Sequence, residues 1–285
     1  MQDEPSAGAA ADDAMIEELV GLVEAAGEAI LRIYETDFDV QTKSDESPLT
    51  QADLASHRVL AEGLQRLAPE LPLFSEEADL PPFEQRRRWQ RYWLVDPLDG
   101  TKEFINRNGE FTVNVALIDG QRPVVGVVGV PVRKQVYVGV EGRGAWRFDR
   151  RGAQQTRVTL SGRARRDDAP LVVVASRSHG GERLEHYLGS LESAFGRVVR
   201  TPVGSSLKLC ILAEGEADLY PRLGPTSEWD IAAAHAVLAA AGGDVWAVDG
   251  SPLTYNSKDS VLNPEFFAAA DGRYPWRARL PAVPR

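Results

Sequence analysis

The stretch Trp93-Leu-Val-Asp-Pro-Leu-Asp-Gly-Thr-Lys-Glu-Phe104 joins the end of an apolar run to a turn that carries two carboxylates. The run stops at Asp96, Pro97 cannot donate a hydrogen bond to a neighbouring strand, and Gly100 permits a turn open to few other residues. We therefore expect Asp96 and Asp99 at the carboxyl end of a buried strand, where open α/β sheets bind their ligands. Two carboxylates and a backbone carbonyl form an all-oxygen site suited to Mg²⁺. The alternative for either residue alone is a tight surface turn.

Other short segments also place carboxylates at the ends of predicted elements. Glu76 and Glu77 follow the apolar pair Leu73-Phe74, and Asp230 opens an alanine-rich helix. Asp53 completes an [ST]-x-x-[DE] pattern at a helix start. Taken singly, these side chains have ordinary interpretations as solvent-exposed acids or helix caps. Their functional interpretation depends on their meeting Asp96 in space.

Composition argues against one broad class of function. The chain of 285 residues is 43% hydrophobic and 26% charged, as in ordinary globular proteins. Its formal charge of −10 argues against general nucleic-acid binding, which needs a basic face. An acidic protein that acts on an anionic substrate needs a local source of positive charge, and bound metal ions can supply it. The single cysteine, Cys210, lies in an apolar run and is expected to be a buried structural thiol.

Neither a membrane span nor an export signal is predicted. No apolar run approaches the ~20 residues that a transmembrane helix needs. Residues 1–13 are rich in Ala, Asp and Glu, and we expect a disordered lead-in rather than a signal peptide there. The expectation is a cytoplasmic protein without a transmembrane segment, with a peripheral contact at the inner membrane left open.

Hydrophobic spacing divides the chain into two parts. Residues 13–34 and 50–68 have the spacing of amphipathic helices, and residues 113–148 have the alternation and turns of an antiparallel meander. After a polar junction, strands alternate with helices, which favours an α/β unit. We expect an N-terminal α+β domain over 14–155 and a C-terminal α/β domain over 156–285. The last fifteen residues, rich in Arg and Pro, are expected to form a tail.

Two polar segments in the second half could contact a substrate. Gly204-Ser-Ser-Leu-Lys208 places small residues and hydroxyls at a helix start, where free N–H groups bind anions. Ser176-Arg-Ser-His179 follows a predicted strand, and His179 is the histidine that we expect nearest to a ligand. An ordinary helix cap and a polar loop are the alternatives.

Together, these segments resemble the lithium-sensitive, magnesium-dependent phosphatase superfamily that includes inositol monophosphatase. The markers are Ser-Glu-Glu at 75–77, Asp-Pro-Leu-Asp-Gly-Thr at 96–101 and Trp-Asp-Ile-Ala-Ala-Ala at 229–234. The resemblance spans about residues 14–270. Segments 47–53, 89–105, 108–114, 176–179, 204–208 and 219–226 make the chain most similar to the bisphosphate nucleotidases of that superfamily. The implied fold is a layered α/β/α/β/α sandwich that combines α+β and α/β parts.

The resemblance also assigns roles to residues. It implies metal ligands at Glu76, Asp96, the Leu98 carbonyl, Asp99 and Asp230. It gives Asp53 and Thr101 the task of orienting and deprotonating the attacking water, with Glu77 nearby. It implies substrate contacts at Gly100, Thr101, Ser176, His179, Gly204, Ser205, Ser206, Lys208 and Asp230.

The implied activity is hydrolysis of the 3′-phosphate of adenosine 3′,5′-bisphosphate to AMP and phosphate, with phosphoadenosine phosphosulfate as a further substrate. The implied cofactor is Mg²⁺, two or three ions per site, with inhibition by Li⁺. An inositol monophosphatase is the first alternative, because the metal motifs are shared across the superfamily. A fructose-1,6-bisphosphatase is less favoured, and a non-catalytic phosphate or nucleotide sensor would require a lost ligand. Oligomeric state is left open.

Overall fold

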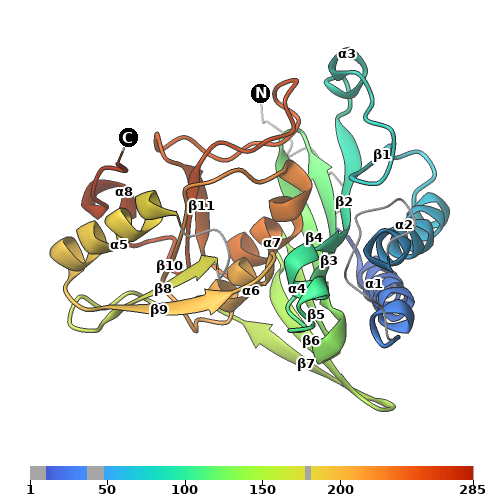
Figure 1. Ribbon diagram of the computed structural model, residues 1–285. Coiled ribbons are helices and arrows are strands. Elements are labelled where there is room, and N and C mark those ends of the chain that lie inside the picture. The colour runs from blue at the N-terminus through green and yellow to red at the C-terminus, as the bar shows by residue number, and fades with distance from the viewer. Residues whose placement is uncertain (1–10, 37–47, 177–180, 285) are drawn as a thin grey trace, which may run out of the picture.

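The computed structural model describes residues 11–36, 48–176 and 181–284 (Figure 1). Its strands form a seven-stranded sheet in the order β1-β2-β3-β4-β5-β6-β7 and a five-stranded sheet in the order β11-β12-β10-β8-β9. The first sheet contains β1 (Leu73–Ser75), β2 (Arg91–Asp99), β3 (Thr112–Asp119), β4 (Arg122–Val130), β5 (Gln135–Val140), β6 (Gly144–Arg151) and β7 (Gln154–Leu160). The second contains β8 (Leu171–Ser176), β9 (Val198–Val203), β10 (Leu219–Arg222), β11 (Asp244–Ala247) and β12 (Phe266–Ala269).

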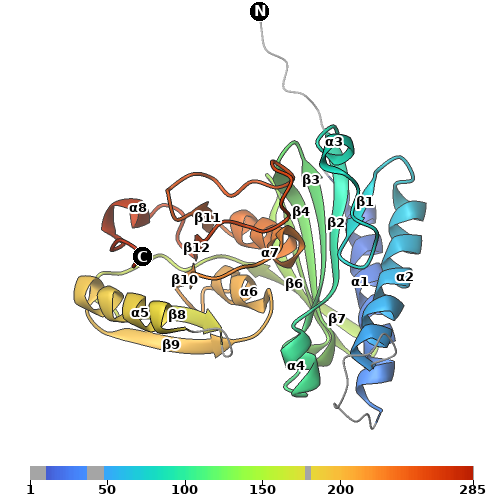
Figure 2. The ribbon, with the colours of Figure 1, turned by 45° about the horizontal axis from the view of Figure 1, so that its top comes forward.

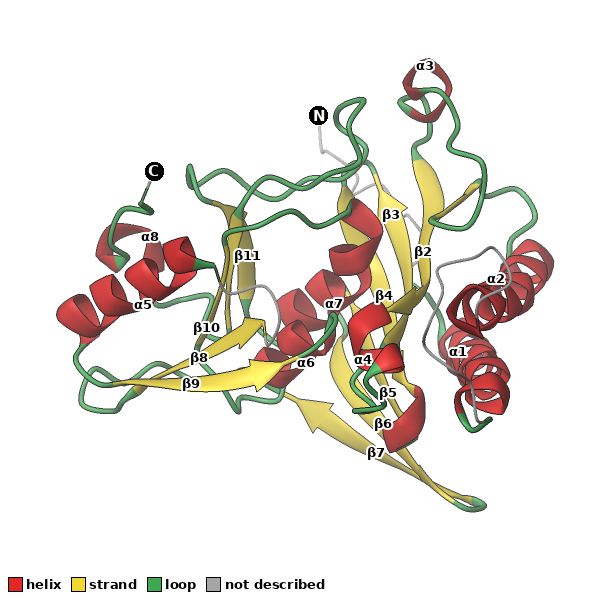
Figure 3. Cartoon of the chain, in the orientation of Figure 1, coloured by secondary structure: helices red, strands yellow, loops and turns green. Residues whose placement is uncertain are grey.

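Helices cover both faces of each sheet, and the result is the expected α/β/α/β/α sandwich (Figures 2 and 3). One outer layer holds α1 (Asp13–Tyr34) and α2 (Pro48–Leu67), and the other holds α5 (Glu182–Phe195) and α8 (Trp276–Arg279). Between the sheets lie α6 (Leu207–Ala213) and α7 (Glu228–Ala240). Three short elements lie in connections: α3 (Phe83–Arg86), α4 (Thr101–Ile105) and the 3-10 turn η1 (Pro131–Arg133).

Strand β2 shows why its sequence is apolar without interruption. Successive side chains of a strand point to opposite faces of the sheet. Tyr92 and Leu94 join the core on the α7 side, whereas Trp93 and Val95 join the core formed with α1 and α2. Both faces are therefore buried, and β2 brings the carboxylates at its end to the middle of the molecule.

Helix α7 packs so closely on the first sheet that two strand positions accept only glycine. A Cβ at Gly126 of β4 would lie 2.0 Å from the carbonyl oxygen of Ala233. A Cβ at Gly139 of β5 would lie 2.4 Å from Cα of Val237. The alanines of α7 and these glycines let the two backbones touch. This contact fixes the distance between α7 and the sheet. It therefore also fixes the position of Asp230, which lies in the first turn of α7.

The helices and strands of the first half are those expected, but some begin or end at different residues. Helix α1 spans the expected residues, and α2 begins two residues earlier than expected, at Pro48. Strand β7 pairs with β6, so the first sheet continues to Leu160, past the expected domain boundary at 155. Residues 154–159 of β7 are exposed on both faces, so they lack the alternation that marks a half-buried strand.

The two chain ends are more ordered than the sequence indicated. Ala11 is buried and the Asp12 side chain caps α1, so the described part of the expected lead-in belongs to the fold, whereas residues 1–10 lie outside the description. The expected C-terminal tail is wrong. Trp276 is buried, and Tyr187 of α5 donates a hydrogen bond to the Pro281 carbonyl at 3.3 Å. The burial of aromatic side chains outweighs the polar composition of the C-terminal segment.

Cys210 is buried, as the sequence predicts. None of the described helices is long and apolar enough to span a bilayer.

Candidate active site

The end of β2 presents Asp96 and Asp99 as the sequence indicates. Pairing with β3 shifts register between these two residues, because Pro97 cannot continue the ladder. Asp96 is 1% exposed and its Oδ1 accepts a hydrogen bond from the Leu98 amide at 3.0 Å. The Pro97 carbonyl accepts a hydrogen bond from Ser56 Oγ of α2 at 2.8 Å. The turn is therefore held in place by its own side chain and by α2.

Glu76 and Asp230 reach the same place from two other elements. Strand β1 runs parallel to β2, and the amide of Glu76 donates to the Val95 carbonyl at 3.2 Å, so Glu76 leaves the sheet beside Asp96. Asp230 lies in the first turn of α7, where its Oδ2 accepts from the Ser227 amide at 2.9 Å in a capping box. Carboxylate oxygens of Glu76, Asp96 and Asp230 all lie within 4.8 Å of one another.

These carboxylates line one cavity of about 600 Å³. Acidic side chains and Leu98 contribute one part of its wall, α4 contributes another, and the start of α6 with β10 contributes the rest. The lining residues are Asp53, Glu76, Asp96, Leu98, Asp99, Gly100, Thr101, Lys102, Glu103, Ile105, Ser205, Ser206, Lys208, Tyr220, Arg222, Thr226, Asp230 and Ile231. The cavity thus collects residues from both halves of the chain.

The acidic side chains are held in surroundings that disfavour their charge. Burial, together with the charges of Glu77 and Glu76, raises the pKa of Asp53 from 3.8 to about 8. Burial raises the pKa of Asp230 to about 8, with the Asp99 charge adding to the effect. Burial also raises the pKa of Glu76 to about 7, that of Asp99 to about 6 and that of Asp96 well above its usual range.

A divalent cation fits this donor set. Asp53 Oδ1 is buried and accepts no hydrogen bond from the described residues. Such an oxygen is costly unless it gains a partner. Oxygen ligands of this kind are those that Mg²⁺ takes in proteins, and a cation would offset the repulsion among the carboxylates. The arrangement can therefore bind a divalent metal ion.

Two cationic side chains face the same cavity from the second half of the chain. Lys208 is 6% exposed, its Nζ donates to the Ser205 carbonyl at 2.7 Å, and burial lowers its pKa to about 8. Arg222 at the end of β10 donates to the Pro225 carbonyl at 2.6 Å. Sequence reasoning identified Lys208 but missed Arg222, together with Lys102 and Glu103 of α4. The only signal for Arg222 was its place in the family-like segment 219–226.

The amides of the turn before α6 do not play the role that the sequence suggests. The Gly204 amide donates to Glu110 Oε2 at 2.8 Å, and the Ser206 amide donates to Asp99 Oδ2 at 2.5 Å. These two N–H groups therefore already have carboxylate acceptors. Ser206 Oγ is bonded to Asn114 Oδ1 at 2.7 Å, whereas Ser205 lines the cavity. In this geometry the turn connects the two sheets instead of offering free amides to a phosphate.

The remaining expected site residues have varied positions. Thr101 is exposed at the first position of α4, after Gly100, whose φ of +100° is open to few residues other than glycine. The charge of Glu77 acts on Asp53 and His57. His179 and the side chain of Ser176 lie outside the described residues, so their expected contacts stay predictions.

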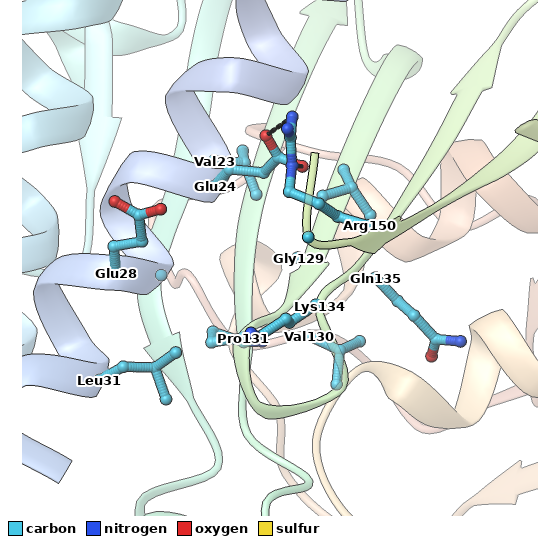
Figure 4. A pocket seen from close by; sticks show the side chains of 13 residues that line it. Val23, Glu24, Glu28, Leu31, Gly129, Val130, Pro131, Lys134, Gln135 and Arg150 are labelled. Atoms are coloured by element: carbon cyan, nitrogen blue, oxygen red, sulfur yellow. Dashed lines mark hydrogen bonds and ion pairs between the residues drawn. The ribbon is translucent and has the colours of Figure 1, made fainter. Parts of the chain in front are cut away.

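A second cavity, of about 260 Å³, lies between α1 and the β4–β5 connection (Figure 4). Its ionic groups include Glu24 and Arg150, which pair with each other through bonds of 2.8 and 2.5 Å. The pair satisfies both charges, and α1 lies on the face of the first sheet away from α7. The cavity lined by the carboxylates is therefore the candidate active site.

Comparisons with known proteins agree with this geometry. The Inositol monophosphatase family model matches residues 11–274. The 3′(2′),5′-bisphosphate nucleotidase CysQ of Escherichia coli strain K12 is 50% identical over 254 residues, which cover 88% of this chain and 98% of that protein. The CysQ of Haemophilus influenzae is 34% identical over 252 residues, covering 88% of this chain and 91% of that protein.

Solved structures extend the likeness to three dimensions. The crystal structure of CysQ from Bacteroides thetaiotaomicron has a TM-score of 0.80 and 40% identity, covering 90% of this chain and 98% of that one. An inositol monophosphatase from Zymomonas mobilis, 23% identical, shares the fold with a TM-score of 0.74 over 95% of this chain and 99% of that one. With a family match over most of its length, the chain belongs to the inositol monophosphatase family.

Proposed function

We propose that the protein is a Mg²⁺-dependent 3′(2′),5′-bisphosphate nucleotidase that releases the 3′-phosphate of adenosine 3′,5′-bisphosphate and leaves AMP. One observation carries the proposal: a single cavity holds carboxylates from α2, from the residue after β1, from β2 and from α7, together with cations that include Lys208 and Arg222 of the second half. The relatives of 50% and 34% identity that bear the nucleotidase name support it. Phosphoadenosine phosphosulfate is a further candidate substrate, because it carries the same 3′-phosphate.

Five groups would hold the metal: the carboxylates of Glu76, Asp96, Asp99 and Asp230 and the carbonyl of Leu98. When bound, two or three Mg²⁺ ions would activate water and neutralise charge on the phosphoryl and leaving oxygens. The protein's own contribution is to hold these ligands on strand and helix ends, so that the phosphate approaches from the open side of the cavity. Inhibition by Li⁺ belongs to the same proposal.

Asp53 and Thr101 would prepare the attacking water. Asp53 Oδ1 is buried without a hydrogen bond from the described residues, and it lines the cavity beside the other carboxylates. A carboxylate so placed can accept the proton of the water, and the Thr101 hydroxyl at the start of α4 can orient it. Glu77 would act through its charge on Asp53.

The two cations distinguish a bisphosphate from a monophosphate substrate. A second phosphate that is not bound to metal needs positive charge, and Lys208 and Arg222 supply it within the same cavity. An inositol monophosphate has no second phosphate for these two cations to bind. Ser205 lines the wall beside Lys208 and would add a hydroxyl contact, with Gly204 and Ser206 shaping the turn and Ser176 and His179 as further proposed contacts.

Inositol monophosphatase activity is the second candidate, because the chain belongs to the family that is named for it. A non-catalytic sensor is a third candidate, but the carboxylates that this alternative would lack are present: Asp53, Glu76, Asp96, Asp99 and Asp230 all line the cavity. The candidates therefore differ in the substrate they select and in whether turnover occurs.

The test is phosphate release from adenosine 3′,5′-bisphosphate and from inositol 1-phosphate, measured side by side with Mg²⁺ and again with Li⁺ added. We expect the nucleotide to be preferred by a hundredfold or more in kcat/KM, about 2.7 kcal/mol of transition-state discrimination, and release to be lost with Li⁺. Equal or reversed preference would favour the inositol monophosphatase. Release from neither substrate would favour the sensor. Phosphoadenosine phosphosulfate in a third arm measures the relative preference between the two nucleotides.

A further inference from the structure

A fully buried arginine lies in the connection between β1 and β2, residues 76–90, which is called the β1–β2 excursion below. Arg86 ends the short helix α3 and is 0% exposed. Its Nη1 donates to Asn256 Oδ1 at 2.5 Å and to the Lys258 carbonyl at 3.2 Å, and its Nη2 donates to the Asp259 carbonyl. Two of these three acceptors are uncharged backbone carbonyls, and the third is an amide oxygen. The Asp259 carboxylate lies 3.8 Å from Nη2, but that side chain is largely exposed and its charge is therefore screened by solvent. Burying a guanidinium against such partners is costly, so its position calls for a reason beyond packing.

Asn256 connects Arg86 to the start of α7. Its Nδ2 donates to the backbone carbonyl of Arg86 at 2.6 Å, so the two residues bond in both directions. Its own amide donates to Glu228 Oε2 at 2.7 Å. The backbone of Asn256 is left-handed, with φ of +53°, a conformation that asparagine tolerates better than most residues. One residue thus holds both an arginine and a carboxylate.

Glu228 is the first residue of α7 and is fully buried. Its amide donates to the Val261 carbonyl at 2.8 Å, and its Oε1 lies 3.9 Å from Lys258 Nζ. The loop that carries Asn256 continues to Asn263, whose amide donates to the Thr226 carbonyl at 2.8 Å. The loop over residues 256–263 is therefore bonded to both sides of the helix start, and two residues further along α7 is Asp230.

The β1–β2 excursion, which contains Arg86, begins at Glu76. Both ends of the Arg86–Asn256–Glu228 chain therefore lie on segments that carry a carboxylate of the acidic cluster. A second contact joins the same segments: the rings of Phe74 and Trp229 meet edge to face, with centroids 5.8 Å apart. The guanidinium of Arg86 lies 5.5 Å from the centroid of the Phe74 ring. The two ligand-bearing segments are thus joined directly, by Phe74 and Trp229, and also through the hydrogen bonds of Arg86.

We propose that the Arg86–Asn256–Glu228 chain is a positioning device for the metal site. It fixes the segment that carries Glu76 relative to the first turn of α7 that carries Asp230, and so sets the affinity for Mg²⁺ without touching metal or substrate. The inference rests on the proposed function, because it takes the acidic cluster to be a Mg²⁺ site. Arg86 and Asn256 are positioning residues, and a purely structural role is the competing explanation.

Two variants separate these explanations. Asn256→Gly keeps the left-handed backbone and the N–H bond to Glu228 but removes both side-chain bonds to Arg86. Arg86→Lys keeps the charge but cannot reach all the acceptors of a planar guanidinium. The matched control is Arg165→Lys. Arg165 is also buried and also donates to backbone carbonyls, those of Ala169 and Pro170, but it lines a different cavity, of about 280 Å³, in the second half.

The measurement is Mg²⁺ binding by titration calorimetry on the full-length protein, with the melting temperature and the substrate KM at saturating Mg²⁺ as companions. We expect both test variants to weaken Mg²⁺ binding tenfold or more, about 1.4 kcal/mol, with the KM changed less than twofold. Arg165→Lys should lower the melting temperature with Mg²⁺ binding unchanged. Arg86→Lys and Asn256→Gly proteins that melt earlier but bind Mg²⁺ as tightly as the wild type would overturn the proposal.

The same experiment separates this inference from the proposed function. A wild-type protein that binds Mg²⁺ but releases no phosphate from the bisphosphate would contradict the nucleotidase, and weaker binding by the variants would still support the positioning role. A wild-type protein that hydrolyses the bisphosphate, with variants of unchanged Mg²⁺ affinity, would leave the nucleotidase intact and reject the positioning role. If Arg86→Lys does not fold, Asn256→Gly alone decides.

Discussion

The backbone amide of Ser206 donates a hydrogen bond of 2.5 Å to Asp99 Oδ2, across 107 positions of the sequence. The bond joins the end of β2 in the first sheet to the turn before α6, which leads into the second half of the chain. It helps to place Lys208 and Arg222 in the same cavity as the carboxylates. The proposed metal site and the proposed phosphate pocket are thus connected through Asp99. Substitutions of the carboxylates test the first, and substitutions of Lys208 and Arg222 test the second.

Replacing Asp96 by asparagine should remove activity without weakening the fold. Asp96 is buried, and its pKa is raised first by burial and then by the charge of Glu76, so an uncharged amide fits there at least as well. We expect phosphate release by Asp96→Asn to fall by about a thousandfold or more, roughly 4 kcal/mol, with the melting temperature equal or higher. Steady-state kinetics and thermal unfolding measure both effects. Asp79→Asn, at an exposed position of the β1–β2 excursion, is the control. Substantial activity in Asp96→Asn would refute its assignment as a metal ligand.

Without divalent cations, stability should fall as the pH rises. The pKa of Asp53 rises from 3.8 to about 8 on folding, chiefly by burial. The folded protein therefore binds this proton more tightly than the unfolded chain, and the free energy of unfolding decreases between about pH 4 and pH 8. Asp230 acts in the same direction, with a pKa raised to about 8.

Added Mg²⁺ should reverse that loss, because it binds the deprotonated carboxylates of the folded state. The measurement is the melting temperature in EDTA and in Mg²⁺ at several pH values from about 5 to 8. We expect the difference between the two curves to widen as the pH rises. The double variant Asp96→Asn/Asp230→Asn should lose most of this difference. A Mg²⁺ effect that is constant with pH would contradict the coupling.

Much of the first half and of the acidic site could be predicted from local sequence. Apolar runs that end in Asp, Pro and Gly place Asp96 and Asp99, and strong periodicity locates α1. What could not be predicted depends on distant partners. Glu110 accepts the Gly204 amide across 94 positions, so the turn that resembles an anion site is already occupied. Arg222 reaches the cavity because β10 lies at the centre of the second sheet, which no local pattern reveals.

Removing either cation should weaken binding of the bisphosphate selectively. We expect Lys208→Met and Arg222→Met each to raise the KM for adenosine 3′,5′-bisphosphate by about ten- to a hundredfold, roughly 1.4–2.7 kcal/mol. Turnover of inositol 1-phosphate, which lacks the second phosphate, should change far less. Lys134→Met, an exposed lysine at the other cavity, is the matched control. Equal losses on both substrates would show that the cations serve the reacting phosphate instead.

The close contact between α7 and the first sheet predicts a coupled loss of stability and activity. In Gly139→Ala the new methyl would lie 2.4 Å from Cα of Val237, a backbone atom that moves only if the whole helix moves. We expect a loss of about 2–3 kcal/mol in the free energy of unfolding, as for other overpacked cores. Because α7 carries Asp230, displacement of the helix should also weaken Mg²⁺ binding.

The control for Gly139→Ala is Gly189→Ala in α5, where an added Cβ meets no atom within 4 Å. Alanine is the better helix former, so this variant should gain about 0.5–1 kcal/mol and keep its Mg²⁺ affinity. Denaturant unfolding gives the two free energies, and calorimetry gives the two affinities. A Gly139→Ala protein that is destabilised but binds Mg²⁺ normally would mean that the sheet moves and the helix does not. In that case the loop over residues 256–263, not the sheet, would hold Asp230 in place.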